Sequence, residues 1–244
     1  TENNSMKPTM TAKRKISAAV IAVLLSALLA VSGVMIYREL HTQQKEKEDF
    51  RELAEMVAPE SDIETEPETQ GESETSETAK PEEALRDLSG LFAENSECIG
   101  WLCIPDTAIN YPVMHTPDAP QKYLRRNFYG EYSQSGVPFL DFRCDPGGGN
   151  LLIYGHNMKN GTMFSDLKKY LDAAFLESHP TVELQTADGL RRYTVSEVKA
   201  TDTSDEWYRD TGANLFGDRD FLALSTCYGS GRNGRLLVIA VQDN

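Results

Sequence analysis

Residues 221–242, FLALSTCYGSGRNGRLLVIAVQ, decide how the rest of the chain is interpreted. Two apolar runs, 221–227 and 235–242, flank a turn that contains three glycines. This pattern predicts an antiparallel hairpin. Cys227 ends the first run and Arg235 begins the second, so the hairpin should bring their side chains close together. Cysteine is often a buried core residue, so the pairing alone leaves the role of Cys227 open.

Short apolar runs bounded by turn residues recur across the C-terminal part of the chain. Such runs are typical of β-strands. Together with the hairpin they make eight strands and little helix, which predicts a mainly β fold, either a closed barrel or a sandwich. The other six predicted strands are residues 98–105, 109–114, 137–142, 150–156, 181–187 and 191–200.

Two segments interrupt the strand pattern and predict helices. Residues 83–95 carry apolar side chains at helical spacing. These side chains are Leu85, Leu88, Leu91 and Phe92. The second helix is expected after the strand at 150–156, over residues 163–170 with an extension to 175.

The N-terminal part predicts a membrane anchor. Residues 16–37 carry no charge, and a helix of this length spans about 30 Å, the thickness of a hydrocarbon core. Lys13, Arg14 and Lys15 precede it, which predicts a cytoplasmic basic tail at 1–15 and an extracellular location for everything after 37. The alternative is a secretory signal that is cleaved near the sequence AVSG.

The net charge of −14 is concentrated beyond the anchor, where residues 39–83 hold 16 acidic and 4 basic residues. Residues 38–57 predict a polar juxtamembrane helix. Residues 59–81 contain too few apolar side chains to fold and predict an extended acidic linker. Residues 38–81 therefore separate the anchor from a domain at 82–244. No clustered basic surface favours nucleic-acid binding.

The four cysteines, Cys98, Cys103, Cys144 and Cys227, form no CxxC pair and no regular disulfide framework. A Cys98–Cys103 or a Cys103–Cys144 bridge remains an alternative. The spacing does not suit zinc, and no metal or cofactor is predicted.

His156 is the histidine placed best for chemistry, because it ends an apolar strand and opens onto a polar loop. His41, His115 and His179 are expected to be structural or exposed. A thiol has an ordinary pKa of about 8.5, and a nearby imidazolium or guanidinium lowers it. The sequence therefore favours a reactive site made of Cys227, His156 and Arg235.

Arg235 is the preferred guanidinium because it begins a strand, whereas Arg232 lies within the turn. A fixed guanidinium can hold a substrate carbonyl or stabilise an oxyanion. His156 can exchange protons with leaving and attacking amines.

Three segments, in this order along the chain, resemble class B sortases, the cysteine transpeptidases of Gram-positive cell surfaces. FYGEYSQSGVPFLDFR at 128–143 and YGHNMKNGTMFSDLKKY at 154–170 are similar to that class, and LSTC followed by a short loop and GRLLVIA resembles the C-terminal signature of sortases. The resemblance covers roughly residues 91–241.

The resemblance implies an eight-stranded barrel with N-terminal helices and one helix after the histidine strand. By position, Cys227 matches the nucleophile, His156 the histidine and Arg235 the arginine, and Ser225 and Thr226 are expected to line the substrate site. The implied reaction cleaves a secreted protein after the threonine of a C-terminal sorting motif of the Asn-Pro-x-Thr type. The acyl group then passes from Cys227 to an amine of a peptidoglycan precursor or of a pilin lysine.

One segment departs from the class B pattern, which has a substantial helix between the two strands before the cysteine. Only residues 201–220 are available here, enough for one short helix, and this difference bears on the sorting motif rather than on the chemistry. Trp207, Tyr208 and Phe216 are expected in the core rather than in the substrate groove. Two other functions remain open: a cysteine peptidase that only hydrolyses, and a non-catalytic membrane-anchored binding module.

Overall fold

The computed structural model describes residues 12–58, 85–210 and 220–243. The chain divides into two units, residues 1–45 and residues 46–244, which are described separately. The predicted acidic linker at 59–81 and Phe216 lie outside the described residues.

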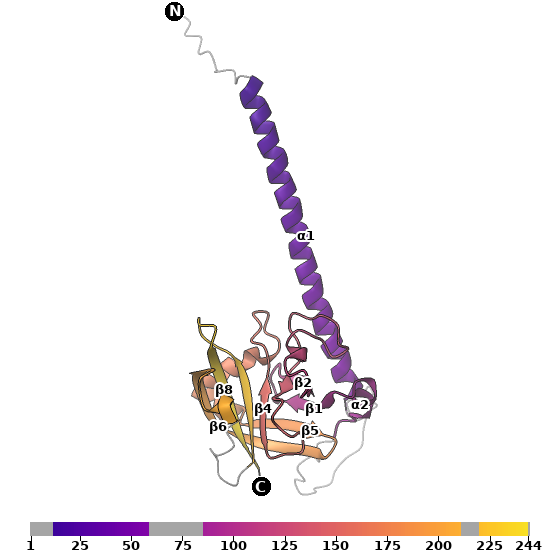
Figure 1. The fold of residues 1–244 in the computed structure, drawn as a ribbon, viewed down its shortest axis with the longest axis vertical. Helices are drawn as coiled ribbons and strands as arrows, with labels where there is room; N and C mark the ends of the chain where they lie inside the picture. The colour runs from indigo at the N-terminus through magenta and orange to yellow at the C-terminus, as the bar shows by residue number, and fades with distance from the viewer. Residues whose placement is uncertain (1–11, 59–84, 211–219, 244) are drawn as a thin grey trace, which may run out of the picture. The chain divides into compact units, whose positions relative to one another are not determined.

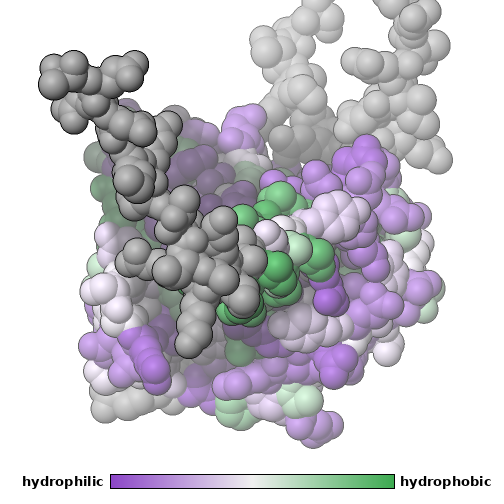
Figure 2. Space-filling model, turned by 90° about the horizontal axis from the view of Figure 1, so that it is seen from above, coloured by the Kyte–Doolittle hydropathy of each residue, from purple (hydrophilic) through white to green (hydrophobic). Residues whose placement is uncertain are grey.

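Helix α1 runs from Ala12 to Met56 without a break. It contains the predicted anchor at 16–37, and among the described residues it holds one segment, Val23–Met56, that is long and apolar enough to cross a membrane. Many large apolar side chains between Val20 and Leu40 are exposed. Figure 2 shows a surface that is mostly hydrophilic, with the most strongly coloured group of hydrophobic residues near its centre.

Eight strands form a closed barrel in the order β1-β2-β3-β4-β7-β8-β6-β5 (Figure 1). All eight predicted strands are confirmed, and the structure decides for a barrel over a sandwich. Their bounds are β1 Cys98–Cys103, β2 Asn110–Met114, β3 Phe139–Leu140, β4 Asn150–Tyr154, β5 Thr181–Thr186, β6 Gly189–Asp202, β7 Phe221–Cys227 and β8 Gly234–Gln242.

The predicted strand lengths were wrong at β3 and β6. β3 has only two residues, because Gly136 adopts a φ of +62° and Pro138 has no N–H to donate to a ladder. β6 extends over 14 residues because it pairs with β5 at one end and with β8 along most of its length.

The predicted helix at 83–95 is shorter than expected and forms α2, Ser89–Glu94. The side chain of Gln185 explains the late start: its Oε1 accepts from Arg86 N at 3.0 Å and its Nε2 donates to Arg86 O at 2.6 Å. These bonds hold the backbone of Arg86 against β5 and away from helical pairing. Leu85 is consequently exposed, whereas Leu91 is fully buried.

Two short helices, not one, follow β4. The first is the 3₁₀ helix η3, Phe164–Leu171, and the second is α3, Ala173–Ser178. Asp172 separates them because its side chain caps α3 by accepting a hydrogen bond from Ala174 N. Phe164, Leu167 and Tyr170 are buried at every third position, as the three-residue turn of a 3₁₀ helix requires.

The last turns of α1 belong to the compact unit. Leu53, and Val57 directly after the helix, are 0% exposed and belong to a buried cluster that includes Trp101 and Tyr123. Figure 1 shows α2 beside this end of α1. The helix predicted at 38–57 is therefore not only a polar spacer, and the compact unit begins at Glu46 rather than at 82.

All four cysteines lie within the described residues, and the structure records them as thiols rather than disulfides. The alternative bridges Cys98–Cys103 and Cys103–Cys144 are absent. Burial raises the pKa of the Cys98 thiol to about 11, so this cysteine is protonated and unreactive at neutral pH.

Candidate active site

The β7–β8 hairpin has the predicted register, with Cys227 directly opposite Arg235. The six residues before Cys227 are buried, whereas Cys227 itself is exposed. The strand is therefore ordinary barrel core until its last residue, where the thiol reaches solvent. This excludes the interpretation of Cys227 as a buried core residue.

The guanidinium of Arg235 is fixed by its own turn. Its Nη1 donates to Arg232 O at 3.1 Å and to Gly234 O at 2.9 Å. Within the described residues its hydrogen bonds all use Nη1, so the N–H groups of Nε and Nη2 remain available to a ligand. Arg232, the alternative guanidinium, is exposed and does not line the pocket described below.

Gly234 allows this turn to close tightly. Tyr228 N donates to Gly234 O at 3.0 Å, and a Cβ on Gly234 would lie 2.0 Å from Tyr228 O. Only a residue without a side chain fits, which fixes the backbone directly before Arg235.

His156 reaches the same site because β4 and β7 are parallel neighbours. Tyr154 pairs with Ser225, and Gly155 N donates to Ser225 O at 3.0 Å. The two strands therefore end at the same edge of the barrel. Asn157 strengthens this junction, since its Nδ2 donates to Cys227 O at 2.9 Å. The role of Asn157 was not predicted from the sequence.

The tautomer of His156 follows from its hydrogen bond to Leu124 O, 3.0 Å from Nε2. A carbonyl oxygen only accepts, so Nε2 carries the hydrogen and Nδ1 of the neutral ring carries a lone pair. Burial lowers the pKa of His156, and the positive charge of Arg125 lowers it further, against the opposite effect of the Leu124 carbonyl. The ring is therefore neutral and able to accept a proton at Nδ1 near neutral pH.

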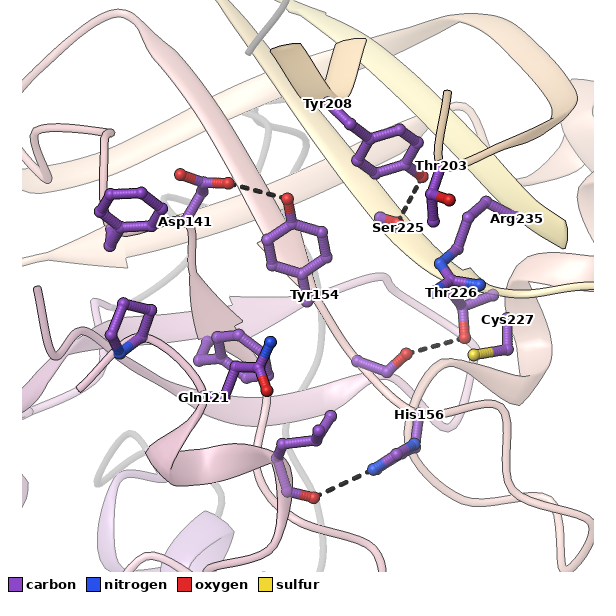
Figure 3. Close-up of a pocket in the computed structure, with 15 residues that line it drawn as sticks. Gln121, Asp141, Tyr154, His156, Thr203, Tyr208, Ser225, Thr226, Cys227 and Arg235 are labelled. Carbon is purple, nitrogen blue, oxygen red and sulfur yellow. Dashed lines mark hydrogen bonds between the residues drawn. The ribbon is translucent and has the colours of Figure 1, made fainter. Parts of the chain in front are cut away.

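Cys227, Arg235 and His156 border one pocket of about 350 Å³ (Figure 3). Figure 3 shows Cys227, Arg235 and His156 gathered on one side of the pocket and Asp141 and Gln121 on the other. The remaining lining residues are mostly apolar or aromatic and include Leu124, Phe139, Phe142, Tyr154 and Tyr208. The three other histidines do not line it.

Ser225 and Thr226 line the pocket, but their hydroxyl groups are engaged in the protein. Thr226 Oγ1 donates to Gly155 O at 2.8 Å, and Ser225 Oγ lies 2.8 Å from the hydroxyl of Tyr208. Both residues shape the pocket from β7, and neither hydroxyl points freely into it.

Trp207 and Tyr208 were both expected in the core, but the structure places them differently. Trp207 is 1% exposed and meets the ring of Phe221 edge-on at 5.0 Å, so its core position is confirmed. Tyr208 lines the pocket instead, and burial raises its pKa to about 12. Both lie in the short helix α4, Trp207–Asp210.

A buried carboxylate network supports the wall opposite Cys227, and no sequence pattern predicted it. Asp141 is 4% exposed and accepts hydrogen bonds from Arg143 Nε and Nη2 and from the Tyr154 hydroxyl, each at 2.8 Å. Burial raises the pKa of Asp141, but these hydrogen bonds outweigh it and the net shift is downward. Arg143 Nη1 also donates to Tyr208 O at 3.0 Å, which links the network to α4.

A thiol, a neutral imidazole and a fixed guanidinium around one pocket are the groups that acyl transfer through a thioester requires. The sortase domain family matches residues 102–243, more than half of the chain. The chain belongs to the sortase family.

Two curated sortases are similar over the barrel. Sortase B of Listeria monocytogenes is 38% identical over 145 residues, which cover 57% of this chain and 55% of that protein. Sortase B of Staphylococcus aureus is 30% identical over 146 residues, which cover 59% and 58%. The matched part of this sortase therefore spans little more than half the length of these relatives.

Solved class B sortases have the same fold. The crystal structure of sortase B from B. anthracis in complex with AAEK1 superimposes with a TM-score of 0.62 at 26% identity and covers 83% of this chain and 98% of that one. The Staphylococcus aureus sortase B–substrate complex gives 0.57 at 26% identity, with 64% and 83% covered. A sortase B complexed with triglycine gives 0.57 at 27% identity, with 64% and 84% covered.

Proposed function

We propose that this sortase is a class B cysteine transpeptidase that uses Cys227, His156 and Arg235. The observation that carries the proposal is the pairing of an exposed Cys227 with Arg235 in a pocket that His156 also borders. Membership of the sortase family and the similarity to sortase B proteins support the same reaction class.

In the first step, Cys227 Sγ attacks the carbonyl carbon of the scissile peptide bond. The thiol proton passes to His156 Nδ1, a thioester bond forms, and the C–N bond breaks as His156 gives that proton to the leaving amine. The neutral state of His156 and the lone pair on Nδ1 suit it to accept the proton.

Arg235 stabilises the negative charge that develops on the carbonyl oxygen, or holds the neighbouring substrate carbonyl. The bonds from Nη1 to the turn keep the guanidinium in place before the substrate arrives. A preorganised donor of this kind stabilises the transition state without being reoriented during the reaction.

In the second step, an incoming primary amine attacks the thioester. Its proton passes through His156 back to Cys227 Sγ, the new amide bond forms, and the free thiol is restored. The acceptor is an amine of a peptidoglycan precursor or of a pilin lysine. The existence of a sortase B complex with triglycine supports a small amine acceptor.

The substrate is a secreted protein with a C-terminal sorting motif of the Asn-Pro-x-Thr type, cleaved after Thr. An extended peptide carrying a proline suits a pocket bordered by Phe139, Phe142, Tyr154 and Tyr208. The similarity to a sortase B–substrate complex supports a peptide in this position.

The apolar part of α1 anchors the protein in the cell membrane as a single span. Lys13, Arg14 and Lys15 support a cytoplasmic N-terminus and a barrel on the outer side, where secreted substrates arrive.

Mass spectrometry of the reaction products tests the proposal. The full chain in detergent micelles is incubated with an Asn-Pro-x-Thr peptide, with and without triglycine or an amine-bearing lysine peptide. The proposal expects a thioester on Cys227 and an amide product that appears only with the amine. A Cys227→Ala variant should form neither.

Hydrolysis with every acceptor tried would instead identify a cysteine peptidase. If the wild-type chain binds the peptide but Cys227 is never acylated, the protein is a binding module and the proposed reaction is wrong.

A further inference from the structure

We propose that Glu46 of α1 is a positioning residue that holds His156 in its reactive orientation. The inference rests on the transpeptidase function proposed above and concerns a residue far from Cys227 in the sequence. Glu46 is 8% exposed. Its carboxylate accepts hydrogen bonds from Ser133 Oγ at 2.7 Å, from Gln134 N at 2.9 Å and from Ser135 Oγ. One carboxylate of α1 thus fixes three consecutive residues of a loop.

This loop rests directly on the turn that contacts His156. Gly136 has a φ of +62°, and a Cβ there would lie 2.4 Å from Tyr123 O and 2.8 Å from Leu124 O. Val137 N donates to Tyr123 O at 3.0 Å. The loop and the 3₁₀ helix η2, Lys122–Leu124, are therefore in backbone contact with no room for a side chain between them.

Two more hydrogen bonds lock the same pair of segments. Ser133 N donates to Arg125 O at 3.1 Å, and Arg125 Nη1 donates to Gln134 O at 2.9 Å. Ser133 and Gln134 are two of the three residues that Glu46 holds. A shift of the loop would therefore also shift Arg125 and the carbonyl group before it.

That carbonyl is Leu124 O, the partner of His156 Nε2. The contacts run without interruption from Glu46 through the loop at 133–137 and the turn at 122–125 to the imidazole. Because the Leu124 carbonyl sets both the tautomer and the direction of the ring, Glu46 acts on the proton acceptor through it.

Glu46 is a buried carboxylate whose hydrogen-bond donors, among the described residues, all belong to the loop at 133–135. No lysine, arginine or histidine pairs with its carboxylate in the described ranges. A buried carboxylate is costly unless hydrogen bonds satisfy it, and here the donors come from one loop. An apolar residue at this position would border the same small cavity as Phe50 and Leu53 but would leave the loop without an anchor.

The test compares Glu46→Ala with Glu52→Ala, an exposed glutamate on the same helix. The full chain in detergent micelles is treated with iodoacetamide from pH 5 to 9, and mass spectrometry follows the peptide containing Cys227. In the proposed mechanism the thiol proton of Cys227 passes to Nδ1 of His156, so the alkylation rate reports on this transfer. Both variants keep Arg125, whose charge lowers the pKa of His156, and keep Arg235 and Asp141, which line the same pocket.

Glu46→Ala is expected to slow alkylation near pH 7 by about tenfold and to move its half-maximal rate to higher pH. Glu52→Ala should match the wild type. Glu46→Gln should retain most of the rate, because its carbonyl oxygen still accepts from Ser133 and Gln134. A merely structural role would lower the melting temperature of Glu46→Ala but leave the alkylation profile superimposed on the wild-type curve, and that result would overturn the inference.

If Glu46→Ala does not fold, Ser135→Ala decides, since it removes one donor only. Slower alkylation of the folded Ser135→Ala chain supports the inference, and an unchanged profile contradicts it. Alkylation needs no peptide substrate. If Cys227 of the wild type is alkylated normally but never transfers a peptide, the proposed function is wrong. The role of Glu46 is tested separately by the alkylation rates of its variants.

Discussion

Cys227 and Arg235 lie directly opposite each other across the β7–β8 hairpin, and both border the same pocket. Their relation is local in sequence and is fixed by the turn between them. By contrast, His156 joins them only because β4 pairs in parallel with β7.

Replacing Arg235 by lysine should lower kcat/KM for peptide cleavage by roughly 100-fold or more. An ammonium group cannot both bond the two turn carbonyls and present a planar pair of N–H groups to the substrate. Arg232→Lys is the matched control, because its side chain lies outside the pocket. Near-normal rates for Arg235→Lys, measured with a fluorogenic peptide, would contradict the proposed role.

Gly234→Ala should reduce cleavage strongly, although the position bears no reacting group. The added Cβ would meet Tyr228 O at 2.0 Å, so the turn must open and displace Arg235. Gly231→Ala provides the control, since a methyl group added at Gly231, in the same turn, would meet no atom within 4 Å. Equal rates of peptide cleavage for the two variants would show that the turn accepts a side chain at 234 without displacing Arg235, and would contradict the prediction.

The acid limb of the pH profile should lie below pH 6.5. Burial lowers the pKa of His156 from its ordinary value of 6.5, so the neutral, proton-accepting form is already dominant at that pH. The pH at which the acid limb of kcat/KM for peptide cleavage reaches half its maximum reports an ionisation of the free enzyme and should therefore lie below 6.5. A half-maximal point above pH 6.5 would mean that His156 is not the group accepting the proton.

Asp141→Asn should destabilise the protein by about 2 kcal/mol at neutral pH, because the carboxylate loses charge-assisted hydrogen bonds with Arg143 and Tyr154. The folded pKa of Asp141 is depressed below its ordinary value of 3.8. Its contribution is therefore fully present above the unfolded pKa of about 4 and is lost as pH falls through the folded pKa.

Chemical denaturation at several pH values checks this prediction. The difference in free energy of unfolding between wild type and Asp141→Asn should shrink as pH falls below about 4. Asp118→Asn, an exposed aspartate, should show no such difference at any pH. If the difference in free energy of unfolding between wild type and Asp141→Asn stays the same below pH 4, packing rather than ionisation accounts for the effect of Asp141.

The strands and the hairpin could be predicted from the sequence because both depend on residues that are close together along the chain. Alternating apolar runs and turn residues located all eight strands. The lengths of β3 and β6 were not readable, since they depend on which strands pair beside them. Helix α2 began later than predicted because Gln185, from a distant strand, holds Arg86.

The candidate site shows the same division. Cys227 and Arg235 were paired by the hairpin, and His156 was selected by its place at a strand end. No sequence pattern predicted three interactions at the site: the Tyr208–Ser225 contact, the Asp141 network and the hydrogen bond from His156 to Leu124. Each joins residues whose separation along the chain carries no periodic signal.

The sequence by itself therefore determined the elements, the β7–β8 pairing and the types of reactive group, because turn chemistry and hydrophobic periodicity act over short stretches of chain. Only the tertiary structure decided that the strands close into a barrel and that β4 brings His156 to the pocket. It also decided that Glu46 belongs to the compact unit. Those features depend on hydrogen bonds and burial between segments far apart in sequence, which form only when the whole chain folds.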